Sequence, residues 1–194
     1  NPFQILPDSL FVDGPAQIGF NTAAFIAAQP GWWKNYSTYA GDRVRTGAEV
    51  VDFVAQNFSV SPRLLLAILE YKAGAISRSS APQKHYVLDF PQLIYARASN
   101  LNYLQLVWAA NTLNNGYYGW RSGKLTEFYE KDGTIIRPDP WQNAASVAIQ
   151  YFFSRTSSGP LYDTATGSGG LIATYEALFG KNLDQPAPLV PGSL

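Results

Sequence analysis

One carboxylate and one ammonium, Glu70 and Lys72, follow an apolar run in the middle of the chain. The run, residues 64–69, reads Leu-Leu-Leu-Ala-Ile-Leu and has no polar face, so it predicts a helix buried in the core. A carboxylic acid at the edge of such a core can have a raised pKa and act as general acid in glycosidic cleavage. An ammonium has the wrong pKa for that step and repels the positive charge that develops. Glu70 is therefore the candidate catalytic residue, and the alternative is a carboxylate at the core edge that a neighbouring cation or backbone N–H satisfies.

The residues that flank the apolar run predict where this helix begins and ends. Ser61 can cap it with its side-chain oxygen, and Pro62 suits the first helical position. Gly74 can adopt the left-handed conformation that ends a helix. Two positions along a helix rotate a side chain by roughly 200°, so we expect Glu70 and Lys72 on opposite faces.

Aromatic residues are the candidate binding residues. Tyr117, Tyr118 and Trp120 belong to the segment GYYGWR, which we expect to be an exposed loop. Their rings can stack on sugar faces or on a partner domain, and Tyr71 and Lys72 are further candidates near the end of the central helix. The alternative is that these rings cover the core from outside, and the sequence leaves both interpretations open.

Three more carboxylates lie on a predicted hairpin, at Glu127, Glu130 and Asp132. One of them can serve as a second carboxylate beside a cleft, although alternating polar residues on a hairpin are more often solvated surface. The single histidine, His85, has no partner set by spacing and no nucleophile elbow accompanies it, so we expect a packed or exposed loop residue.

Composition restricts the class of protein. The 194 residues fit one domain, and a hydrophobic share of 46% with 14% charged residues allows a sizeable core. The net charge is zero and there is no basic run, so we expect no nucleic-acid partner. One histidine and no cysteine exclude disulfides and an ordinary His/Cys zinc site, and we expect no metal and no cofactor. No apolar run reaches the ~18 residues of a membrane span.

The pattern along the chain predicts a mainly α fold with one small β-hairpin. The first 18 residues are expected to be an extended arm, residues 85–90 a short strand, residues 91–98 a helical turn and residues 156–170 a flexible loop. We expect one domain over residues 1–183 and a proline-rich linker over 184–194. Helices are predicted over residues 22–29, 47–56, 62–73, 101–115, 141–154 and 171–179, and the hairpin over residues 126–138.

The central helix resembles the lysozyme-like superfamily, and within it the lytic transglycosylases. Residues 64–68, LLLAI, match the start of that family's signature, and DPWQN (139–143) resembles the opening of a later family helix. At the position of the family's catalytic glutamate stands Lys72, and Ala73 and Ala75 replace its serine and aromatic residue. The resemblance implies a lysozyme-like helical domain whose glycosidase activity is incomplete.

The whole chain also resembles the region that precedes a lysostaphin-like zinc peptidase in certain exported bacterial cell-wall proteins. The motifs are FVDGPAQIGFNT (11–22), SPRLLLAILEY (61–71) and GYYGW (116–120). This resemblance implies an extracellular or cell-wall location and a zinc peptidase domain after the linker as a partner. Since the chain begins with Asn1 rather than Met, we expect a processed piece whose export signal lay upstream.

Three functions therefore stay open. The first is a domain that binds peptidoglycan, or positions a downstream peptidase, without full glycosidase activity because of Lys72. The second is an active peptidoglycan-cleaving glycosidase or lytic transglycosylase that uses Glu70 as general acid. The third is a structural interaction domain with no affinity for glycans. Where the Glu70 carboxylate points distinguishes the first two.

Overall fold

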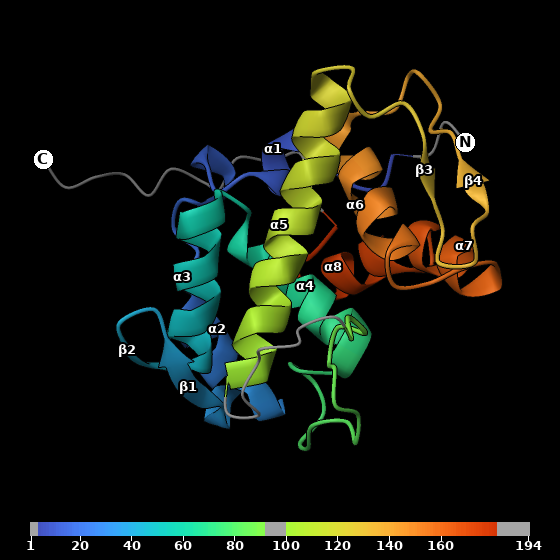
Figure 1. The fold of residues 1–194 in the computed structure, drawn as a ribbon. Coiled ribbons are helices and arrows are strands. Elements are labelled where there is room, and N and C mark those ends of the chain that lie inside the picture. Colours follow the sequence, from blue (N-terminus) through green and yellow to red (C-terminus); the bar gives the residue numbers. More distant parts are fainter. Residues whose placement is uncertain (1–3, 92–99, 182–194) are drawn as a thin grey trace, which may run out of the picture.

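The computed structural model describes residues 4–91 and 100–181, which are mainly helical with two small antiparallel sheets (Figure 1). The predicted fold class, mainly α with a small hairpin, is confirmed. The α-helices are α1 (Asp8–Phe11), α2 (Thr22–Ala27), α3 (Gly47–Phe58), α4 (Pro62–Ala73), α5 (Leu101–Arg121), α6 (Ala144–Ser154), α7 (Pro160–Thr166) and α8 (Leu171–Phe179). The short elements are the 3-10 helices η1 (Pro15–Gln17) and η2 (Trp32–Asn35) and the strands β1 (Ser37–Ala40), β2 (Arg43–Thr46), β3 (Phe128–Tyr129) and β4 (Ile135–Ile136).

Helix α4 is the buried centre of the fold, as the apolar run predicts. All six residues from Leu64 to Leu69 are fully buried, and the helix packs against α3 and α8. The Ser61 hydroxyl accepts a hydrogen bond from the Leu64 N–H at 3.3 Å, and Pro62 is the first helical residue. Gly74 ends the helix with φ at 57°, a conformation that costs glycine little.

Helix α5 is the longest described helix and runs between α3 and α6 (Figure 1). The prediction that Gly116 ends it is wrong, because the helix continues to Arg121. Gly116 instead lets α5 approach α6: a Cβ at this position would lie only 2.8 Å from the Cα of Ala148. The segment GYYGWR is therefore the end of a helix and not the exposed loop expected from the sequence.

The N-terminal third contains short elements that the sequence pattern does not predict. The first 18 residues were expected to be extended, but they include α1 and η1. Strands β1 and β2 pair with Ser37 opposite Thr46 across a turn at Gly41, where φ is 68°. Thr46 then caps α3 in a capping box, in which Glu49 accepts a hydrogen bond from the Thr46 N–H at 2.8 Å.

The C-terminal third confirms the predicted hairpin, in which Phe128 pairs with Ile136. The predicted flexible loop at 156–170 is wrong in part, because Pro160 begins α7 and that helix buries Tyr162. The predicted strand at 85–90 is a series of turns, with Asp89 at a φ of 63°. The predicted turn at 91–98 falls almost wholly outside the described residues, as does the predicted linker. None of the described helices has the length and apolar character needed to cross a membrane.

Candidate functional site

Lys72, at the end of α4, is built into an ion cluster. Its ammonium donates to Asp89 Oδ2 at 3.2 Å and to Thr156 Oγ1 at 3.0 Å, and its side chain is only 7% exposed. The Lys84 ammonium donates to the other oxygen of Asp89 at 2.8 Å. Burial lowers the pKa of Lys72, and the carboxylate of Asp89 offsets part of that shift. The residue that the transglycosylase resemblance aligns with a catalytic glutamate is therefore a paired cation.

Glu70 lies on another side of the same helix end, and its carboxylate organises the chain that follows α4. One oxygen accepts hydrogen bonds from the N–H groups of Ile76 and Ser77, at 2.8 and 3.1 Å. The other accepts from the Ser77 hydroxyl at 2.5 Å. These contacts hold the turn beyond Gly74. Catalysis by Glu70 stays a prediction, and a carboxylate that accepts three hydrogen bonds from its own chain is poorly prepared to donate a proton to a sugar oxygen.

The other predicted binding residues have different surroundings. Tyr71 is half-buried, with the edge of its ring against Phe153 at 5.4 Å between ring centroids. Tyr117 is buried and stacks on Phe11, with ring centroids 4.3 Å apart. Tyr118 is 51% exposed. Tyr118 is therefore accessible to a ligand, whereas Tyr117 contributes mainly to the core.

Trp120 lies beside a shallow pocket of about 440 Å³ at the C-terminal end of α5. Its indole N–H donates to the carbonyl of Gln142 at 2.9 Å, which joins α5 to the segment that precedes α6. The pocket carries no charged side chain and is lined by Trp120, Gly123, Leu125, Thr126, Pro138 and Pro140. A pocket of this size and neutrality suits a small uncharged ligand.

Trp141 directly follows Pro140 of this pocket and is 87% exposed, which is unusual for a tryptophan. The segment that carries it is fixed at both ends. The Trp141 N–H donates to the carboxylate of Asp139 at 3.0 Å, and the Gln142 N–H donates to the Asp139 carbonyl at 2.9 Å. We call Trp120, Trp141 and the pocket between α5 and Pro140 the tryptophan site.

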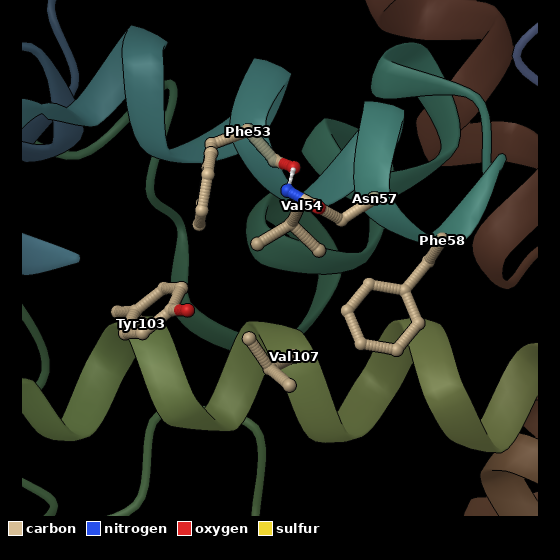
Figure 2. Close-up of a pocket in the computed structure, with 6 residues that line it drawn as sticks. All are labelled: Phe53, Val54, Asn57, Phe58, Tyr103 and Val107. Carbon is tan, nitrogen blue, oxygen red and sulfur yellow. Dashed lines mark hydrogen bonds between the residues drawn. The ribbon is translucent and has the colours of Figure 1, made fainter. Parts of the chain in front are cut away.

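A second pocket, of about 360 Å³, lies between α3 and α5 (Figure 2). Phe53, Val54 and Phe58 of α3 face Tyr103 and Val107 of α5 across it. The amide of Asn57 donates to the Phe53 carbonyl at 2.6 Å within its own helix. The groove is apolar and offers no pair of acidic groups that could cleave a glycan.

The comparison with protein families decides what this domain is. The profile described as "LasA, N-terminal domain" matches residues 4–189, almost the whole chain. The chain belongs to the LasA N-terminal domain family. This membership agrees with the resemblance to a region that accompanies a lysostaphin-like peptidase. Neither the curated proteins nor the solved structures gave a match, so the lysozyme-like fold stays a prediction.

In this LasA N-terminal domain, the three carboxylates of the predicted hairpin each have a partner of their own. Glu127 pairs with Arg137 across the hairpin at 2.9 Å, and Asp132 accepts from the Thr134 N–H in its turn. Glu130 is buried and accepts from the Gly159 N–H at 2.6 Å. Within residues 4–91 and 100–181, no three His, Cys, Asp or Glu side chains gather in a group that could hold a metal ion.

Sequence reasoning missed Trp141, although its signal was present. An aromatic residue directly after Asp-Pro is set in a turn, where burial is difficult. The segment was interpreted instead as the first turn of a helix, which begins only at Ala144.

Proposed function

We propose that this LasA N-terminal domain holds the glycan of the bacterial cell wall at the tryptophan site, in an exported protein that also carries a LasA-type peptidase. The domain binds the wall and does not cleave it. Binding places the peptidase beside its substrate.

The exposed indole of Trp141 is the observation that carries the proposal. A pyranose ring has an apolar C–H face and a polar rim, and the apolar face can stack on an exposed indole. Pro140, which precedes Trp141, lines a pocket without charged side chains. The turn that carries Trp141 is fixed by Pro140 and by the hydrogen bonds of Asp139. Little conformational entropy is then lost when a ligand binds.

The end of α4 supports a role without cleavage. Cleavage through an oxocarbenium-like transition state needs a protonated carboxylic acid next to the scissile oxygen. The resemblance to lytic transglycosylases aligns that acid with Lys72, which in this domain is paired with Asp89. The nearest carboxylate, Glu70, is engaged with Ile76 and Ser77.

Co-sedimentation with purified peptidoglycan tests the proposal, together with a fluorescence titration with chitopentaose. We expect wild-type protein to bind and Trp141→Ala to bind about tenfold more weakly, because one stacking contact of roughly 1–2 kcal/mol is lost. Tyr39→Ala removes another exposed aromatic ring, on β1, and is the matched control. Equal binding by wild type and Trp141→Ala would exclude the tryptophan site.

A turbidity assay on cell walls separates holding from cleavage. We expect no clearing with wild type. Clearing that Glu70→Gln abolishes would establish the alternative function, a glycosidase with Glu70 as general acid. Absence of any binding to peptidoglycan would favour the third function, an interaction domain that only positions the peptidase.

A further inference from the structure

A third pocket lies where the β3–β4 hairpin meets the end of α6 and the loop after α4. Its volume is about 250 Å³. It is distinct from the tryptophan site, because the two share no lining residue. Its lining residues are Phe90, Pro91, Tyr129, Glu130, Lys131, Ser154 and Arg155.

Two cations at this pocket have no carboxylate partner among residues 4–91 and 100–181. Lys131 and Arg155 are exposed, and neither makes an ion pair with a residue that the structure describes. The guanidinium of Arg155 lies 5.9 Å from the centre of the Tyr151 ring, its one contact of this kind in the described chain. The only acidic lining residue, Glu130, is buried and already accepts from the Gly159 N–H.

The ion cluster of Lys72 adds to the positive charge behind the pocket. Asp89 precedes the lining residue Phe90, and Thr156, which accepts from Lys72, follows Arg155. Burial is the main cause that lowers the pKa of Lys72, and the charges of Lys84 and Lys131 lower it further. In the ion cluster, two ammoniums, Lys72 and Lys84, share the one carboxylate of Asp89, so a positive charge is left next to the lining residues Phe90 and Arg155.

The apolar wall of the pocket is held in place. Phe90 stacks on Trp108, with ring centroids 3.8 Å apart and an interplanar angle of 11°. The buried Gln105 side chain accepts from the N–H groups of Leu88 and Phe90 and donates to the Phe90 carbonyl at 2.6 Å. On the opposite side, the Glu130 N–H donates to the Thr134 carbonyl at 2.8 Å within the hairpin. The site therefore exists before a ligand arrives.

We propose that this pocket binds a carboxylate carried on a small apolar group, such as the C-terminal residue of a short peptide. Lys131 and Arg155 form charge-assisted hydrogen bonds to the carboxylate. Phe90 and Tyr129 contact the apolar part. The volume accommodates one or two small residues, and the proposal stands independently of glycan binding at Trp141.

The test is an NMR titration of ¹⁵N-labelled protein with N-acetyl-Ala-Ala. We expect the amide signals of residues 89–90, 129–131 and 154–155 to shift. The same dipeptide with a C-terminal amide, which lacks the negative charge, should bind at least tenfold more weakly. The double variant Lys131→Gln/Arg155→Gln should weaken binding of the acid to the same extent, while Lys124→Gln, which removes an exposed cation between α5 and β3, should not.

Two results would overturn the proposal. Equal affinity for the acid and the amide would show that the cations do not recognise a carboxylate. Acetate or inorganic phosphate that binds as tightly as the dipeptide at the same residues would show an anion site without an apolar subsite. Because the tryptophan site is not used in this experiment, neither result bears on glycan binding.

Discussion

The ammonium of Lys72 lies 3.2 Å from the carboxylate of Asp89, and that carboxylate is shared with Lys84 at 2.8 Å. One negative charge thus compensates two positive ones at the end of the central helix α4. Asp89 holds this position with φ at 63°, in a left-handed conformation that aspartate tolerates better than most residues. The predictions that follow begin with this pair.

Replacing Asp89 by asparagine should destabilise the protein by about 2 kcal/mol. Removing one partner leaves the buried ammonium of Lys72 uncompensated, and the partial exposure of Asp89 keeps the loss below that of a fully buried pair. Urea unfolding at neutral pH measures the change. Asp163→Asn, on α7, is the matched control and should leave the free energy of unfolding nearly unchanged. An unchanged free energy of unfolding in Asp89→Asn would show that the pair adds nothing to stability.

Lys72→Met should change how stability depends on alkaline pH. Because burial lowers the pKa of Lys72 in the folded state, the unfolded chain binds more protons between that lowered pKa and 10.5. Lys72 therefore makes the free energy of unfolding increase with pH in that interval. Below the lowered pKa, Lys72 is charged in both states and destabilises the folded state by the full amount. The stability of wild type minus that of Lys72→Met should increase as the pH rises toward 10.5 in urea titrations. A constant difference would contradict the lowered pKa.

Glu49→Gln should make the stability of the protein depend less on pH in the acid range. Hydrogen bonding from the Thr46 N–H, followed by the contact with Arg43, lowers the pKa of Glu49 to about 2. A lowered carboxyl pKa stabilises the folded state above the ordinary value of 4.5, and that contribution is lost as the pH falls through about 2. Thermal unfolding between pH 5 and pH 2 should show a smaller decrease for the variant. The same slope in both proteins would exclude this role of the capping box.

Gly116→Ala should destabilise the protein, although alanine favours a helix by about 1 kcal/mol over glycine. The new Cβ would lie 2.8 Å from the Cα of Ala148 and 3.0 Å from the Cβ of Tyr151, so α5 and α6 must separate. We expect a net loss of about 1–3 kcal/mol, as for overpacked cores. Asn115→Ala, on the exposed face of α5, is the control and should be neutral or stabilising.

Glu70→Gln should cost about 1–2 kcal/mol of stability and leave wall binding unchanged. An amide oxygen accepts more weakly than a carboxylate from Ile76 and Ser77, and the amide nitrogen cannot accept from the hydroxyl of Ser77. Urea unfolding and co-sedimentation with peptidoglycan measure the two effects. A stable variant that no longer binds walls would move Glu70 from a structural to a functional role.

Local patterns in the sequence were enough for the elements whose reasons lie within a few residues. The boundaries of α4 follow from Ser61, Pro62 and Gly74, and the capping box of α3 follows from Thr46 and Glu49. The apolar run of α4 also indicated burial on every side, because no orientation of that helix exposes a polar face. Each of these depends on short-range hydrogen bonding or on side-chain polarity.

Contacts between distant segments decided the rest. The sequence predicts a helix end at Gly116. In the structure, Gly116 lies inside α5, where α5 packs closely against α6. Likewise, tertiary packing brings Lys72 to Asp89 and joins Trp120 to the carbonyl of Gln142, and it leaves Trp141 exposed. Burial, ion pairing and exposure are properties of the assembled core, so residue types and spacing alone do not determine them.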